Sequence, residues 1–163
     1  MITTMNELLG IFRDYATSAT GFDYIFSSPN APRPDYPYGK ISLISLEQKG
    51  YPNRMQTQIV GDDFVQRNDA LFVGVVDFDV KSVDAGNSMM DLINGINLSF
   101  YDIINDNGIG FINFATPVDL TGLEVEKTIR RYRVSLHFDV VITAESISPF
   151  IKSVEVNNLN IGG

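Results

Sequence analysis

The sequence predicts an α+β fold, in which a mostly antiparallel sheet of about four to five strands packs with two helices. Two segments carry apolar residues at helical spacing, several others alternate apolar and polar residues, and the strands come in runs between the helices. With 163 residues, of which 44% are apolar and 20% charged, the chain has the size and composition of one globular domain. Residues 1–163 are therefore expected to form a single domain.

The first helix is predicted from its start signal. Thr4 and Glu7 have the spacing of a capping box, in which each side chain accepts a hydrogen bond from the other residue's backbone N–H. Apolar residues then recur at steps of three or four from Met5 to Ala16, and Gly21 is the expected stop.

Residues 27–38 contain four prolines, with Tyr36 and Tyr38 at the end of the segment. Because proline fixes φ and has no N–H to donate, an extended and irregular Pro-rich arm is predicted here. A linker is an equally open interpretation of the same composition.

The strands are predicted from β-branched residues and period-two alternation. Residues 40–46 form the first, and residues 50–53 are a turn signal. Residues 55–66 and 70–81 are expected to pair around a turn at residues 67–69. In the second of these, Val76, Phe78 and Val80 alternate with polar residues, which is typical of a sheet with one covered and one wet face.

The remaining elements follow the same rules. Residues 84–107 predict one long helix ended by Asn107-Gly108, residues 111–114 a short strand, and residues 128–143 a strongly alternating last strand. Residues 146–163 are expected to be a C-terminal extension.

Composition excludes several classes of function. The chain has no cysteine, which rules out disulfides and thiolate metal sites, and its net charge of −8 argues against a broad nucleic-acid-binding surface. It contains no apolar run of the roughly 20 residues that cross a bilayer, and its start lacks a signal-peptide pattern. A soluble intracellular product is expected.

No catalytic centre emerges from the motifs. The single histidine, His137, shares a strand face with Ser135 and Asp139, but alternate strand residues are about 7 Å apart and point the same way, unlike a triad. Asp77 with Asp79, and Asp62 with Asp63, could hold a divalent ion, although a solvated sheet face explains them better. We therefore assign no catalytic, cofactor-binding or metal-binding residues.

One basic cluster remains in this acidic chain, formed by Arg130, Arg131 and Arg133. It could be a nucleic-acid patch, a solvated strand start, or a set of partners for aspartates. Since a strand divides these arginines between its two faces, ion pairs with Asp77 and Asp79, either across strands or between subunits, are the favoured interpretation.

Two stretches carry a resemblance to a known family. Residues 34–42 are a proline–tyrosine entry into a strand, and residues 130–140 an arginine-rich start to an alternating last strand. With the opening helix and the long central helix, they resemble the tail-terminator (neck or tail-completion) proteins of long-tailed bacteriophages, over residues 5–157.

The resemblance implies a structural virion protein, assembled in the host cytoplasm, that needs no cofactor. Such proteins form a ring, usually a hexamer, that caps the tail tube, ends its polymerisation and joins the head-completion or neck protein, with possible contact to a sheath protein. DNA is expected to pass through an acidic lumen without specific binding. The alternatives are another tail or connector subunit (tube, head–tail connector, baseplate) or a small metal-dependent hydrolase.

Contacts between neighbouring copies are expected at the charged strands, the tyrosines and the C-terminal segment, since an extended segment can add to a sheet edge. Deleting residues 149–163 is expected to weaken the ring without unfolding the domain. The candidate interface residues are Arg130, Arg131, Arg133, Asp77, Asp79, Tyr36, Tyr38, Ile151, Val154 and Val156.

Overall fold

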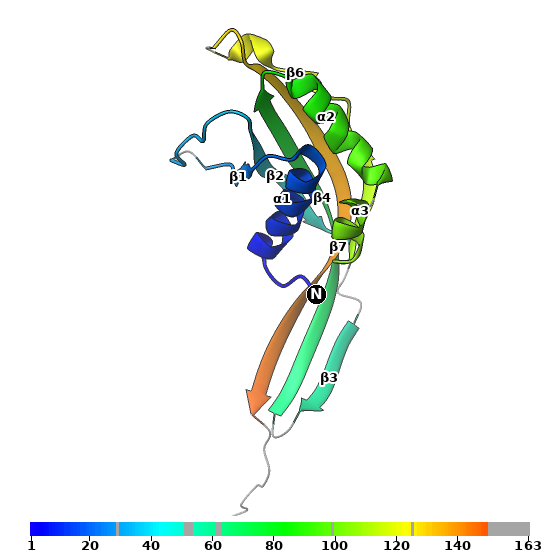
Figure 1. The fold of residues 1–163 in the computed structure, drawn as a ribbon. Helices are drawn as coiled ribbons and strands as arrows, with labels where there is room; N and C mark the ends of the chain where they lie inside the picture. The colour runs from blue at the N-terminus through cyan, green and yellow to red at the C-terminus, as the bar shows by residue number, and fades with distance from the viewer. Residues whose placement is uncertain (29, 51–53, 61–62, 99, 125, 150–163) are drawn as a thin grey trace, which may run out of the picture.

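The structure is a computed structural model that describes residues 1–28, 30–50, 54–60, 63–98, 100–124 and 126–149. Figure 1 shows an elongated molecule in which helices cover part of one long sheet. In chain order the elements are α1 (Met5–Thr20), β1 (Tyr24–Phe26), β2 (Tyr38–Gln48), β3 (Arg54–Val60), β4 (Asp63–Ser82), α2 (Ala85–Asn94), the 3-10 turn η1 (Gly95–Asn97), α3 (Phe100–Asn105), β5 (Ile109–Phe114), β6 (Val118–Asp119), the 3-10 turn η2 (Thr121–Leu123) and β7 (Arg130–Pro149).

The sheet has seven strands rather than the expected four to five, with its main path in the order β1-β2-β4-β7-β5. In addition, β3 pairs with β4 and β6 pairs with β7. The pairing is antiparallel except between β1 and β2. Strands β4 and β7 pair along their whole length of 20 residues, so they form the spine of the molecule.

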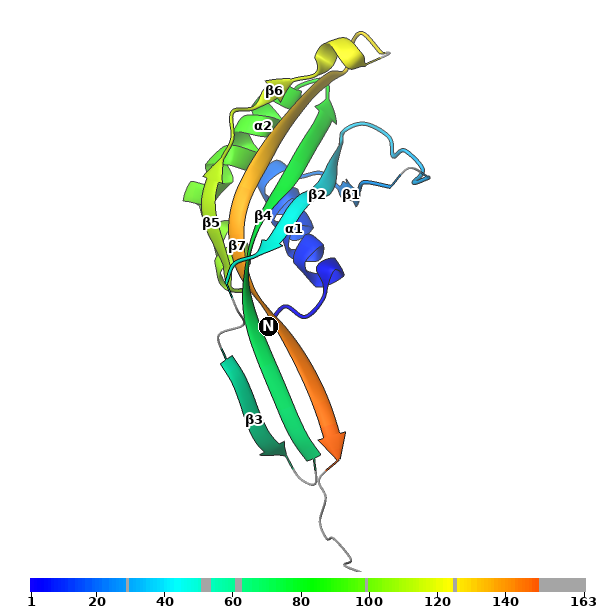
Figure 2. The ribbon, with the colours of Figure 1, turned by 180° about the vertical axis from the view of Figure 1, so that it is seen from behind.

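The core lies between α1, α2 and α3 and the sheet face that they cover, as Figures 1 and 2 show from opposite sides. The expected alternation is confirmed, since Val76, Phe78 and Val80 of β4 face the helices. The expected wet face is wrong at the residues between and after them, because Asp77, Asp79 and Lys81 are buried within ion pairs. From α1, the Phe12 ring packs edge-on against Phe138, with 4.8 Å between centroids. We call the part of the molecule that surrounds this core the body. It comprises all described residues outside a three-stranded ribbon that is defined below.

Both ends of α1 are as predicted. The Thr4 side chain accepts from the Glu7 N–H, and the Glu7 carboxylate accepts from the Thr4 N–H, so the capping box is complete. The helix stops at Gly21, whose φ of 79° is in the left-handed region that favours glycine.

The prediction of a single helix over residues 84–107 is wrong, because the structure has α2, η1 and α3 in its place. The described chain therefore has three α-helices where two were expected. The Tyr15 hydroxyl of α1 donates a 2.5 Å hydrogen bond to the Leu92 carbonyl, near the end of α2. A Cβ on Gly95 would lie 3.1 Å from both Tyr15 and Ala19. The close approach of α1 therefore favours both a glycine and a break at this point.

The turn expected at residues 67–69 is also wrong, since these residues lie inside β4 and pair with β3 and β7. The chain reverses between Val60 and Asp63, which are paired with each other. Arg67 and Asp69 are tolerated within a strand because they interact with each other and with Thr143 of β7.

Strand β7 continues to Pro149, so residues 146–149 belong to the sheet and not to a C-terminal extension. Beyond the helices, β3, residues 63–70 of β4 and residues 141–149 of β7 form a three-stranded sheet that extends away from the body (Figure 1). We call it the projecting ribbon.

Residues 27–37 contain no helix or strand among those described, but they do not form a free arm. They are the loop that joins β1 to β2, two strands paired in parallel, and the peptide bond between Tyr36 and Pro37 is cis. Residues 51–53 of the turn predicted at residues 50–53, the tail after Pro149 and Asp62 lie outside the described residues.

Candidate assembly surfaces

The sheet face opposite the helices carries a charged network centred on Asp79. The Arg131 guanidinium donates to both Asp79 carboxylate oxygens, at 2.6 to 3.0 Å, and Arg133 donates to the same carboxylate at 3.2 Å. Asp79 lies on β4 and both arginines on β7, so these are the cross-strand pairs that the alternation favoured. The hydrogen bonds to Asp79 raise the pKa of Arg131.

Asp77 belongs to the same network. It accepts a 2.5 Å hydrogen bond from the Ser135 hydroxyl, and the Arg133 Nε lies 3.8 Å from its carboxylate. Its oxygens are therefore engaged, and among the described residues no group of three or more His, Cys, Asp or Glu side chains could hold a metal ion. At Asp77 and Asp79, the described residues therefore offer no geometry for the metal-dependent hydrolase that these aspartates suggested.

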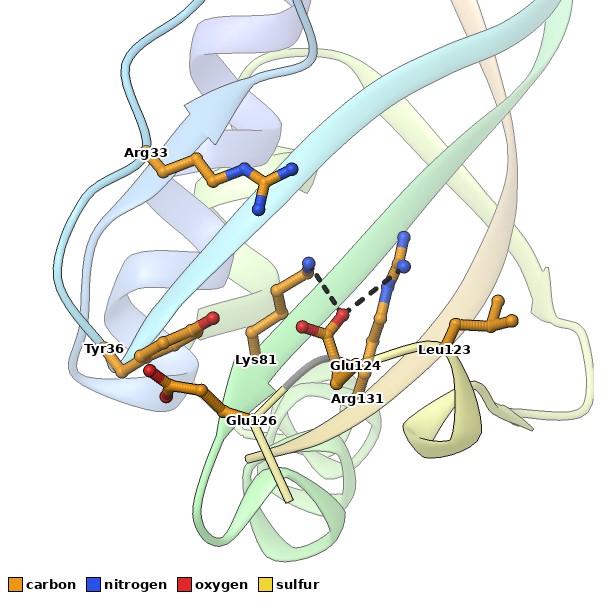
Figure 3. A pocket seen from close by; sticks show the side chains of 7 residues that line it. All are labelled: Arg33, Tyr36, Lys81, Leu123, Glu124, Glu126 and Arg131. Carbon is orange, nitrogen blue, oxygen red and sulfur yellow. Dashed lines mark hydrogen bonds and ion pairs between the residues drawn. The ribbon is translucent and has the colours of Figure 1, made fainter. Parts of the chain in front are cut away.

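The loop after β6 adds a buried ion pair. Glu124 accepts from the Lys81 ammonium at 2.8 Å and lies 3.5 Å from Arg131 (Figure 3). The Lys81 and Glu124 side chains are 6% and 8% exposed. Sequence reasoning missed this pair because nothing in the spacing brings Glu124, on an irregular loop, over the end of β4.

Beside this pair lies a hollow of about 410 Å³, shown in Figure 3. Arg33, from the loop between β1 and β2, extends toward it from the side opposite Leu123. Its lining contains three cations and two anions, and within the described part of the chain Arg33 has no ion pair. We call it the cationic hollow; its lining residues are Arg33, Tyr36, Lys81, Leu123, Glu124, Glu126 and Arg131.

Further cationic character surrounds this hollow. Lys40 of β2 has a lowered pKa, chiefly because it is partly buried and then because Lys81 lies near. The Tyr38 hydroxyl is buried without a hydrogen-bond partner in the described structure, and burial raises its pKa. This surface therefore holds donors that its own acceptors do not fully satisfy.

The projecting ribbon is the second surface. Among its residues whose side chains are described, Thr143 alone is buried. Ile59, Val60 and Ile147 are more than half exposed, and Figures 1 and 2 show no helix against either face. The ribbon thus presents apolar side chains without a core of its own.

The edges of the ribbon are also open. In the described structure β3 pairs only with β4, and within the ribbon (residues 141–149) the outer edge of β7 has no strand partner beyond its isolated bridge from Ile142 to Ile2. Exposed strand edges present unpaired N–H and C=O groups that another chain can join. Two different free edges on one protomer permit head-to-tail contacts between copies.

The candidate interface residues fall in three places. Arg131, Arg133, Asp77 and Asp79 form the charged network, and the described contacts of these side chains are internal. Tyr36 stacks on Tyr38, with ring centroids 5.5 Å apart, but only Tyr36 reaches the surface. Arg130 is exposed at the start of β7, and Ile151, Val154 and Val156 lie outside the described residues.

No helix among the described residues is long and apolar enough to span a bilayer. No curated protein matches the chain. A family model described as phage neck terminator protein matches residues 5–163, nearly the whole chain. The chain therefore belongs to the phage neck terminator family, whose members are structural proteins of the phage tail and neck.

Proposed function

We propose that copies of this chain assemble into a closed ring that caps the tail tube, ends its polymerisation and offers the joining surface for the head or neck. Family membership supports a tail or neck structural role. The observation that carries the ring is the projecting ribbon, because a three-stranded sheet needs a covered hydrophobic face or a packed helix for independent stability. A neighbouring copy would supply that cover.

The geometry of the ribbon favours a cyclic assembly. Its two free edges, one on β3 and one on β7, are different surfaces, so pairing between copies is heterologous. Such contacts close into a ring when the rotation between neighbours divides a full turn. The copy number expected from the resemblance is six.

The net charge of −8 fits a passage for DNA. A lumen lined by an acidic protein repels the phosphate backbone, so DNA passes without sticking. The proposed partners are other copies of this chain, the tail tube protein, the head-completion or neck protein and, in contractile tails, the sheath protein.

The ribbon can be tested by making its apolar tip polar while keeping β propensity. We expect the triple variant Ile59→Thr, Val60→Thr, Ile147→Thr to keep a folded body by circular dichroism but to remain monomeric by light scattering. The matched control, Met90→Gln, Leu98→Gln, Ile112→Thr, changes three body residues of similar exposure and is expected to form rings in negative-stain images.

Two outcomes would contradict the proposal. Rings formed equally well by the ribbon variant would remove the ribbon from the interface. Extended tubes formed by the purified chain would identify a tube subunit instead. The capping step itself is checked by adding the chain to polymerising tail tube protein of the same phage, where tube growth is expected to stop.

A further inference from the structure

The cationic hollow has an apolar neighbour. A second hollow, of about 240 Å³, is lined by Tyr36, Pro37, Ser82, Val83 and Asp84. Tyr36 lines both hollows. Val83 is 68% exposed and Leu123, on the far side of the cationic hollow, 70%. The pair of hollows therefore suits a segment with a carboxylate beside an apolar side chain.

The charges favour a carboxylate over a nucleic acid. Lys81 and Arg131 are already paired with Glu124, whereas Arg33 has no acidic partner among the described residues. Arg33 is thus the one cation of this lining without an ion pair among the described residues, and Glu126 is the one anion without one. A single carboxylate satisfies that cation, while a run of phosphates would meet Glu124, Glu126 and an acidic chain.

The chain itself carries a segment of this chemistry after β7. Residues 150–163 contain one acidic residue, Glu155, which has a valine on each side. We propose that this Val154-Glu155-Val156 segment of one copy occupies the two hollows of a second copy, with Glu155 on Arg33 and a valine against Val83. This rests on the proposed self-assembly and identifies the contact.

The distance along the molecule prevents the Val154-Glu155-Val156 segment from reaching the hollows of its own copy. The hollows lie at the Arg131 end of β7, whereas the tail begins at Pro149, the opposite end of that strand. Eighteen strand residues span about 60 Å, but the six residues from Pro149 to Glu155 reach at most about 20 Å. Glu155 therefore cannot reach the hollows of its own copy, and the contact must link different copies.

Direct binding is tested with a synthetic peptide of residues 150–163. The full chain is labelled at its N-terminal amine and diluted until it is monomeric, and the peptide is then titrated into it. We expect saturable binding with a Kd of about 100 µM or tighter. Arg33→Ala is expected to weaken it about tenfold, since a charge-assisted hydrogen bond is lost, and Val83→Ser about threefold. Arg13→Ala, the same charge change at an exposed residue of α1 outside both hollows, should leave it unchanged.

The peptide supplies its own controls. A peptide with Glu155→Gln is expected to bind about tenfold more weakly than the natural peptide. A protein with Glu126→Gln is expected to bind the natural peptide more tightly, because one repulsive carboxylate is removed. No saturation by about 2 mM peptide, equal binding of a scrambled peptide, or displacement by a single-stranded oligonucleotide would each overturn the inference. None of these readouts depends on ring formation, so the proposed ring stands or falls separately.

The exchange between copies is checked in the assembled state, where the lack of natural cysteines makes crosslinks clean. Chains with Leu123→Cys are mixed with chains with Val156→Cys and oxidised. We expect the disulfide between the two chains to form at least tenfold faster than in a control mixture. In that control, Met90→Cys, an exposed site on α2, replaces Leu123→Cys. Equal rates for the two positions would overturn the inference even where rings form.

Discussion

The body and the projecting ribbon share the same two strands but differ in what covers them. In the body, β4 and β7 bury Val76, Phe78, Leu136 and Phe138 beneath three helices. In the ribbon, the same strands continue without a helix on either face. Continuous backbone pairing extends a sheet, but only side-chain burial makes it stable alone. The body therefore has a core of its own, and the ribbon is the part that we propose a neighbouring copy covers.

The largest difference is expected between truncations in the two regions. Phe12→Ala removes a fully buried ring from the body and should lower the free energy of unfolding by about 3–5 kcal/mol. Ile147→Ala, at a side chain 67% exposed on the ribbon, should cost less than about 0.5 kcal/mol in the monomer. Denaturant unfolding of dilute protein measures both, and comparable losses would erase the distinction.

The two charged clusters give an intermediate difference. Asp79→Asn leaves Arg131 and Arg133 without their shared carboxylate in a buried setting, and should cost about 3 kcal/mol. Asp69→Asn, in the ribbon, changes a more exposed pair with Arg67, and should cost about 1 kcal/mol or less. Thermal unfolding separates them, and a larger loss for Asp69→Asn would mean that the ribbon is the more tightly packed region.

The smallest effect is expected at the start of α1. Thr4→Ala removes the capping side chain and should cost about 1 kcal/mol, whereas Ser18→Ala, at an exposed site in the same helix, should change stability by less. Guanidinium unfolding at pH 7 checks the order of the two variants. An equal effect would assign the helix start to packing alone.

The same cap has a pH dependence of known sign. Hydrogen bonds from Thr3 and Thr4 hold the pKa of Glu7 below its usual value. The contribution of Glu7 is therefore present at neutral pH and is lost as the pH falls through that lowered pKa. We expect the stability gap between the natural chain and Glu7→Gln to close in acid, and a gap that widened there would contradict the capping box.

Local signals predicted the local features of this fold. The capping box at Thr4 and the alternation of Val76, Phe78 and Val80 depend only on neighbouring residues, and both are present as predicted. The break at Gly95 was missed because it depends on the Tyr15 hydroxyl of a distant helix. The strand through Arg67 was missed because one of its two neighbouring strands, β7, lies more than 70 residues away in the sequence.

The same limit applied to the candidate site. The pairing of Arg131 and Arg133 with Asp79 followed from strand faces, which the alternation indicates. The cationic hollow did not, since it depends on two irregular loops that bring Arg33 and Glu124 to the end of β4. Loops have no periodicity from which such a placement can be predicted.

Amide hydrogen exchange tests most directly whether the ribbon is stabilised by assembly. In dilute monomer we expect amides of residues 64–70 and 141–147 to exchange much faster than those of residues 76–80 and 134–140, although all lie in β4 and β7. In the assembled ring the ribbon amides should become as protected as the body. Ribbon amides already as protected in the monomer, or unchanged by assembly, would contradict the account.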